Sequence, residues 1–247
     1  MTKRFLLLFS LLVSFTYAQE SDFLFGIQIK PIIPNAYFNA SNVSQDFNSN
    51  DSTLYSFNLK PRLGQSIGMN IRKNITNVIS FETGINFVQR RYKLEVESEN
   101  VSDYSNFTIR SYEIPIQLLT YVRVSDKWYL NGSFGVSYNV FTSDIYSEGE
   151  QNSFFYQNTI RRKKGQSSFI ANLGTEYRTE TKGYFYFGLS LHRPFKSIVR
   201  VFPEFDDGIN EYNVLAPSIN SDFLELNGNY FTIDLRYFFK QRNKSVL

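Results

Sequence analysis

The sequence predicts an all-β fold, a transmembrane, antiparallel, up-and-down β-barrel of about eight strands with short periplasmic turns and long extracellular loops. Three observations lead to this prediction. The chain opens with an export signal, polar and apolar residues then alternate with a period of two, and short connections alternate with long ones. A barrel in the outer membrane of a Gram-negative bacterium produces this combination, because each strand has one face toward lipid and one toward the lumen.

The first residues are typical of a secretory signal peptide. A positively charged start precedes the apolar run "FLLLFSLLVSF" at 5–15, and small residues follow at Thr16 and Ala18. The apolar run is too short to span a bilayer as a helix, and the small residues suit signal peptidase. We therefore expect a signal peptide over 1–18 and a single outer-membrane β-barrel domain over 19–247.

Alternation with a period of two defines the strands. In "SIGMNIR", for example, Ile67, Met69 and Ile71 alternate with polar or small residues that include Asn70 and Arg72. Segments with this pattern lie at 23–29, 66–72, 79–87, 112–118, 128–140, 168–177, 184–191 and 230–239. One face of each segment is apolar and aromatic, and the other is small, polar or charged. A soluble β-sandwich has the same alternation, so the pattern alone leaves both classes open.

The connections distinguish the two classes. Short polar connections are predicted at 73–77, 125–127 and 179–183, and long polar ones at 33–52, 97–106, 146–165 and 194–225. The two kinds alternate strictly along the chain. A compact soluble domain has no reason to place all its long loops at one end, whereas a membrane barrel does so. The connection lengths therefore favour the membrane barrel over a secreted soluble β-domain.

The composition excludes several function classes. The chain has 0 Cys and 1 His, so it offers no disulfide framework, no thiolate metal site and few acid–base constellations. Its formal net charge of +3 gives no reason to expect nucleic acid as a partner. We expect no cofactor, no metal and no enzymatic activity.

One hairpin resembles a known family. The segment "YEIPIQLLTYVRVSDKWYLNGSFGVSYNV" (112–140) has an E-I-P-I strand, a short turn and an aromatic strand with Gly132 and Gly135. It resembles the PorT-like outer-membrane β-barrel family, and "LGTEYR" (173–178) and "IDLRYFF" (233–239) are similar to later strands of that family. The resemblance implies an outer-membrane barrel but not one shared activity. The chain differs from this pattern in continuing past the last aromatic residues.

Charged residues on the lumen face are the main candidate site. They are Glu82, Glu113, Glu176, Asp234, Arg72, Arg90, Arg123, Arg178 and Arg236. A barrel of about eight strands is only wide enough for side chains to fill it, so these charges are expected to pair across the lumen as a polar plug. A narrow gated path for ions or small solutes is the alternative.

Three function classes follow from these features. The first is a non-enzymatic structural, interaction or secretion-associated envelope protein that acts through its long loops, especially 146–165 and 194–225. The second is the narrow pore. The third is an outer-membrane enzyme that uses His192, although a histidine near the outer rim is more often solvated.

The expected partners belong to the cell envelope. They are outer-membrane lipid and lipopolysaccharide, the barrel-insertion machinery, and an envelope or secretion partner bound by the long loops. The basic cluster "RRKKG" at 161–165 could contact lipopolysaccharide phosphates, or form a solvated face. The acidic segment "EFDDGINE" at 204–211 could hold calcium, although a solvated loop tip is favoured.

Pro115 lies in the middle of a predicted strand, where a closed sheet has no edge to accommodate it. Because proline has no N–H to donate, we expect a local bulge or bend at Glu113–Pro115. Its ring is expected to face the lumen.

Overall fold

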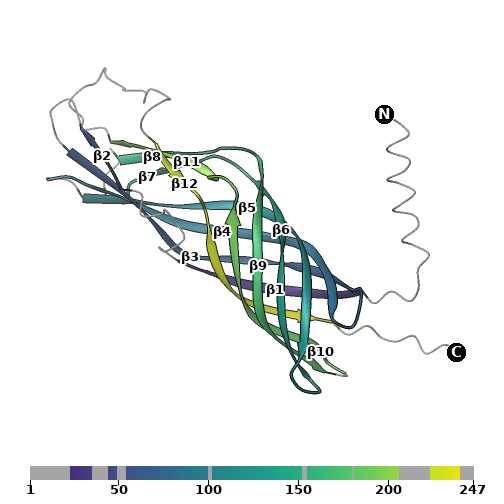
Figure 1. Ribbon diagram of the computed structural model, residues 1–247. Coiled ribbons are helices and arrows are strands. Elements are labelled where there is room, and N and C mark those ends of the chain that lie inside the picture. Colours follow the sequence, from purple (N-terminus) through teal and green to yellow (C-terminus); the bar gives the residue numbers. More distant parts are fainter. Residues whose placement is uncertain are drawn as a thin grey trace, which may run out of the picture.

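The predicted barrel is present. A computed structural model describes residues 23–34, 44–48, 54–99, 102–151, 155–179, 181–205 and 223–239. Its eight barrel strands are β1 (Phe23–Ile33), β3 (Leu54–Asn74), β4 (Ile79–Glu97), β5 (Ser102–Arg123), β6 (Trp128–Phe141), β9 (Gly165–Thr179), β10 (Gly183–Pro194) and β13 (Tyr230–Phe238). Every neighbouring pair is antiparallel, and β1 pairs with both β3 and β13, so the ring closes (Figure 1). No helix in the described part of the chain is long and apolar enough to cross a membrane.

The short connections are also where the sequence predicts them. β3 is followed by β4 after Asn74, β5 by β6 after Arg123, and β9 by β10 after Thr179. The first residue of β1, Phe23, lies opposite Lys73 at the end of β3. The start of the barrel and its short turns therefore lie at the same, periplasmic end. The predicted signal peptide lies outside the described residues.

The two faces of the strands are divided as predicted. Met69 on β3 is 60% exposed and Leu173 on β9 is 62% exposed, and both point away from the barrel. Asn70 and Arg72, between the outward positions of β3, are buried in the lumen. An outward apolar face and an inward polar face are the arrangement that lipid around the barrel requires.

The alternation inverts at the extracellular ends of β3, β4 and β5. There the inward positions become apolar, with Leu59, Leu94 and Ile109 buried. The outward positions become charged, with Lys60 and Lys93 partly exposed. Water replaces lipid around this part of the sheet, so its apolar residues must be buried on the inner side.

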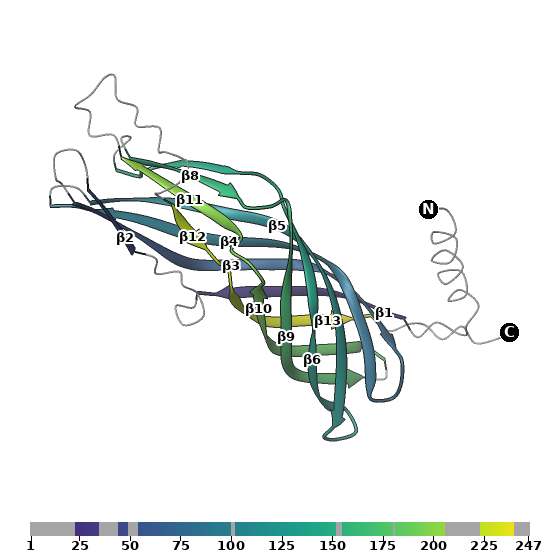
Figure 2. The ribbon, with the colours of Figure 1, turned by 45° about the horizontal axis from the view of Figure 1, so that its top comes forward.

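A second sheet covers this apolar inner surface. It consists of β7 (Ile145–Glu148), β8 (Phe155–Arg161), β11 (Val199–Phe205) and β12 (Leu224–Leu226), in the order β12-β11-β8-β7. Phe155, Val201 and Leu224 from this sheet join one buried cluster with Leu59 and Leu94 of the barrel strands. Figure 2 shows the short strands lying against the extended ends of the barrel strands. Together they form an extracellular β-sandwich, which we call the head.

The head corrects the prediction of long loops. The segments 146–165 and 194–225 contain β8, β11, β12 and part of β7, and 97–106 is a short connection followed by β5. Most of 33–52 lies outside the described residues, which include β2 (Ser44–Asn48) paired with β3. The second sheet escaped prediction because its central pairing, β8 with β11, and its packing on the barrel strands join segments that are distant in the sequence.

Pro115 faces the lumen, as predicted, but no bulge forms. On the β6 side the ladder continues through Pro115, which lies opposite Ser137. On the β4 side pairing stops at Thr83 and resumes at Asn86 in an unchanged register. Because proline donates no hydrogen bond, the ladder is interrupted on this side alone. The Thr83 hydroxyl donates to the Pro115 carbonyl oxygen over 2.8 Å and partly replaces the missing bond.

Two glycines make room for a lumen tyrosine. Gly174 on β9 and Gly188 on β10 lie directly opposite each other. A Cβ atom added to Gly188 would lie 2.2 Å from the Tyr186 hydroxyl oxygen and 2.7 Å from the Leu173 carbonyl oxygen. Neither position can therefore hold a larger residue without displacing Tyr186 or the backbone of the neighbouring strand.

Replacing Gly188 by alanine should therefore destabilise the barrel by about 1–3 kcal/mol, as expected for overpacking of a filled interior. The urea midpoint in detergent micelles, followed by the fluorescence of Trp128, measures this change. Gly132→Ala is the matched control, because the nearest heavy atom to its added Cβ, Thr120 Oγ1, is 3.8 Å away. Equal effects of the two substitutions would contradict the explanation.

Candidate functional site

An ion pair crosses the full width of the lumen. Arg72 on β3 donates from Nε to Glu82 on the adjacent β4 over 2.9 Å, and from Nη1 to Glu176 on β9. Three strands separate β3 from β9 in both directions around the ring, so Glu176 comes from the opposite wall. Arg72 is fully buried, with a relative exposure of 0%. A single side chain therefore joins opposite walls of the barrel.

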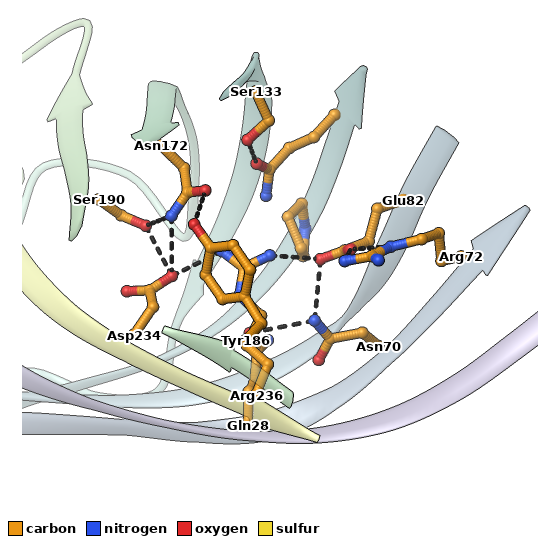
Figure 3. Close-up of polar contacts among 12 residues, drawn as sticks. Gln28, Asn70, Arg72, Glu82, Ser133, Asn172, Tyr186, Ser190, Asp234 and Arg236 are labelled. Carbon is orange, nitrogen blue, oxygen red and sulfur yellow. Dashed lines mark hydrogen bonds and ion pairs between the residues drawn. The ribbon is translucent and has the colours of Figure 1, made fainter. Parts of the chain in front are cut away.

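A second arginine extends this contact into a network. Arg236 on β13 binds Glu82 over 2.7 Å and Asp234 over 2.6 Å. Lys30 on β1 lies 3.5 Å from the same carboxylate of Asp234. Figure 3 shows Arg72, Glu82, Asp234 and Arg236 pointing toward one another from β3, β4 and β13. Glu82 thus binds two arginines, and Asp234 binds one arginine and one lysine.

Amide side chains continue the network toward the extracellular end. Asn70 Nδ2 donates to Glu82 Oε1 over 2.9 Å and to Gln28 Oε1 over 3.2 Å. Gln28 in turn donates to Asn86 Oδ1, and Asn86 Nδ2 donates to Glu113 Oε2 over 3.1 Å. Glu113 is therefore linked to the arginine network by neutral groups.

The extracellular part of the lumen contains a stack of rings and a guanidinium group. His192 Nδ1 on β10 lies 3.0 Å from Glu113 Oε1 on β5, and the strands β9 and β6 separate β10 from β5 in the ring. The His192 ring stacks on Tyr230 with centroids 4.3 Å apart and planes at 9°. The Arg90 guanidinium lies 4.8 Å from the centroid of the same Tyr230 ring and donates to Asn139 Oδ1 over 3.3 Å. These groups occupy the part of the lumen nearest to the head.

The structure joins six of the nine predicted site residues through ion pairs. They are Arg72, Glu82, Glu176, Arg178, Asp234 and Arg236. Glu113 joins them through amides. Arg90 is buried in the lumen but contacts Asn139 and aromatic rings, and no ion pair to it is found within the described residues.

Arg123 does not belong to the lumen network. Its side chain is 60% exposed and binds Asp126 in the following turn over 2.6 Å. It is the last residue of β5, beyond the lumen-facing Tyr121, so its side chain reaches water at the periplasmic end. By contrast Arg178, 22% exposed, stays at the lumen mouth, where it binds Glu176 over 2.7 Å.

One residue of the lumen network, Lys30, was not predicted from the sequence, and another, His192, was predicted in the wrong place. Lys30 has the same parity as Gln28 but follows the end of the predicted strand at residue 29, and β1 continues through it. His192 was expected to be solvated near the rim, whereas it is buried against Tyr230. Its carboxylate partner, Glu113, comes from a distant strand, so no local pattern identifies the pair.

The arrangement fits a structural plug. His192, the residue considered for catalysis, binds Glu113, whereas the nearby Ser190 donates to Asp234 Oδ2 over 2.7 Å, so the two side chains use different carboxylates. No group of three His, Cys, Asp or Glu side chains that could hold a metal occurs in the described ranges. The acidic segment 204–211 lies mostly outside those ranges.

A closed antiparallel barrel with an apolar outer wall and a polar, filled lumen defines a transmembrane β-barrel protein. The sequence agrees with this class. Residues 34–200 match the model of the outer membrane protein beta-barrel domain family, and the chain belongs to that family. It is therefore an outer-membrane protein. No curated protein sequence matches the chain.

Solved structures resemble the fold. The outer membrane protein OprG from Pseudomonas aeruginosa matches with a TM-score of 0.52 at 11% identity, over 90% of this chain and 98% of that chain. An outer membrane channel from Pseudomonas putida F1 has a TM-score of 0.27 at 10% identity, over 90% and 96% of the two chains. A FadL homologue from P. aeruginosa has a TM-score of 0.20 at 7% identity, over 88% and 89%. The similarity to OprG supports the fold.

Removing one partner of the cross-lumen ion pair should lower the free energy of unfolding. Glu176→Ala leaves Arg72 and Arg178 without their shared carboxylate, and we expect a loss of about 3–5 kcal/mol, as for other buried ion pairs broken on one side. Urea unfolding in detergent micelles measures the loss. Asp126→Ala, which breaks the exposed pair with Arg123, is the control and should change little. A similar loss in both variants would show that burial of the network is unimportant.

Proposed function

We propose that this protein is a closed, non-enzymatic outer-membrane barrel that holds an extracellular head for contact with an envelope partner. One observation carries the proposal: Arg72 binds carboxylates on neighbouring and opposite walls and so blocks the lumen. Breaking such a buried contact to open a path costs several kcal/mol. The barrel therefore serves as a membrane anchor.

The head is the part suited to recognition. Its second sheet displays large apolar side chains to the outside, with Tyr146 58% exposed and Ile160 47% exposed. Tyr146 lies opposite Asn158 on β8, two positions before Ile160, and neighbouring exposed apolar side chains on an ordered surface are typical of contact sites. We propose that the partner, an envelope or secretion component, binds through the segments 146–165 and 194–225. A PorT-like relationship would be consistent with a secretion-associated role.

The proposed route to the membrane follows from the sequence. Residues 1–18 would act as the signal peptide in a Gram-negative cell, and the barrel-insertion machinery would then fold the chain into the outer membrane. Lipid and lipopolysaccharide would surround the folded barrel. The narrow pore and the enzyme that uses His192 are the competing functions, and the following measurements separate them from the anchor.

Single-channel recording in a planar bilayer tests whether the lumen is closed. The wild-type protein should insert without discrete conductance steps, because the network fills the lumen. Arg72→Ala/Glu176→Ala removes opposite charges together and should produce steps if the barrel remains folded. Arg123→Ala/Asp126→Ala is the matched control at the exposed periplasmic turn and should remain silent. Steady steps from the wild type would favour the pore.

Photo-crosslinking in living cells tests the role of the head. A photoreactive residue at Tyr146 or Ile160 should give one defined crosslinked product, because these exposed side chains lie on the surface proposed to contact the partner. The same residue at Val78, exposed in a periplasmic turn, is the control and should not give that product. Absence of a product from both head positions, with normal barrel assembly, would count against the interaction role. His192→Gln should leave the crosslink unchanged, because the proposed contact does not use this histidine.

A further inference from the structure

The outer face of β3, β4 and β5 becomes basic just above the apolar band. Phe87 and Tyr112 form an outward aromatic pair on β4 and β5, with ring centroids 5.5 Å apart. Further along the strands, toward the head, the outward positions hold Arg62, Arg91 and Arg110, and all three side chains are exposed. We call these three residues the arginine patch.

The three arginines are close neighbours on one face of the sheet. Arg62 lies directly opposite Arg91 in the β3–β4 ladder. Arg110 lies opposite Gln89, the outward residue two positions before Arg91. Arg62 Nη1 reaches Asn106 Oδ1 on β5 over 2.9 Å, so its side chain lies across β4. The guanidinium groups are therefore concentrated on the surface of two adjacent ladders.

The next pair of cations toward the head shows what the arginine patch lacks. Lys60 and Lys93 also lie directly opposite each other, and Glu95 binds both of them. For Arg62 and Arg91, no ion pair occurs among the described residues. Like charges directly opposite each other destabilise a sheet unless an anion compensates them. Among the residues that the structure describes, Glu95 supplies that anion to the lysines, and no carboxylate is paired with Arg62 or Arg91.

The position of the arginine patch indicates where the anion comes from. Aromatic side chains at the upper edge of an outer-membrane barrel lie at the level of the lipid headgroups. The arginine patch lies directly beyond Phe87 and Tyr112, at the level of the headgroup phosphates of the outer leaflet. Arginine binds phosphate through a planar, bidentate set of donors, so three exposed guanidinium groups suit this level.

A polar cleft of about 370 Å³ adjoins the arginine patch. Its lining includes Arg110, Asn106, Thr108, Ser143 and Tyr146, which supply a cation, an amide, hydroxyl groups and an exposed aromatic ring. Such groups can bind the hydroxyls and the ring face of a sugar. The acidic residue in the lining, Asp144, is engaged by Arg161, with Nε and Oδ1 3.4 Å apart. Asp144 therefore has a cation of its own, and Glu150 at the edge of the cleft accepts a hydrogen bond from Asn106 over 3.3 Å.

The basic cluster identified in the sequence is less suited to this role. Arg161 donates to the backbone carbonyl of Thr142 over 2.8 Å, in addition to its contact with Asp144. Arg162 binds Ser197 over 2.7 Å and lies 3.3 Å from Glu225. Both arginines are used to hold the head together.

We propose that the arginine patch and the adjoining cleft bind the phosphorylated saccharide headgroup of an outer-leaflet glycolipid. The phosphate lies between Arg62, Arg91 and Arg110, and the sugar lies in the cleft along β5. This inference rests on the proposed extracellular placement of the head and specifies its lipid contact. Lipid binding does not depend on whether the lumen conducts ions. The titration with lipid and the conductance recording can therefore contradict one proposal without contradicting the other.

Titration of the full, detergent-folded chain with diphosphoryl lipid A tests the proposal, with complexes counted by native mass spectrometry. Arg62→Gln/Arg91→Gln should weaken binding about tenfold or more, because two charge-assisted contacts are lost. Arg123→Gln/Lys127→Gln removes the same number of charges at the periplasmic turn and should bind like the wild type. The same lipid A after chemical removal of its phosphates should bind the wild type as weakly as the variant binds the intact lipid.

A third variant separates binding from folding. Thr108→Glu places a carboxylate directly opposite Arg91, so that Arg91 gains an anionic partner as Lys93 has in Glu95. This variant should lose the preference for phosphorylated lipid, and its urea midpoint should not fall. Unchanged lipid binding by Arg62→Gln/Arg91→Gln would overturn the proposal. An equal loss of lipid A binding in Arg123→Gln/Lys127→Gln would also overturn it. The same holds if the wild type binds phosphatidylglycerol as tightly as lipid A, since both results would indicate unspecific attraction of anions.

Discussion

The contact of Arg72 with Glu82 and Glu176 is the interaction on which the interior of this barrel depends. A guanidinium group buried away from water is stable only if carboxylates and further hydrogen bonds surround it. Here those carboxylates come from the neighbouring wall and from the opposite wall. The contact therefore links the two walls across the lumen, and the other lumen groups are arranged around it.

The rest of the lumen follows from the same constraint. Glu82 is shared with Arg236, whose second carboxylate, Asp234, also contacts Lys30. Neutral amides then connect this charged part to the Glu113–His192 pair near the head. Charges are thus neutralised locally, by direct partners, over most of the length of the barrel. A lumen filled in this way is suited to holding shape in the membrane.

The surroundings, and not the lumen, determine where the barrel ends and the head begins. The inward face of β4 changes from Glu82 and Asn86 in the membrane to Leu94 and Val96 beyond it, while the outward face changes from Ile85 to Lys93. The same strand is therefore a barrel wall at one end and half of a β-sandwich at the other. The arginine patch lies at this transition, where lipid headgroups meet water.

The sequence by itself determined the barrel class, the eight barrel strands, the short turns and the polar face that includes Arg72 and Glu82. These features depend on periodicity and connection length, which are local properties of the chain. Only the tertiary structure decided that Glu176 reaches Arg72, that His192 is buried against Glu113, and that segments expected to be loops pair into a second sheet. Such contacts join residues far apart in the sequence, so they depend on ring closure and strand register, which no local pattern specifies.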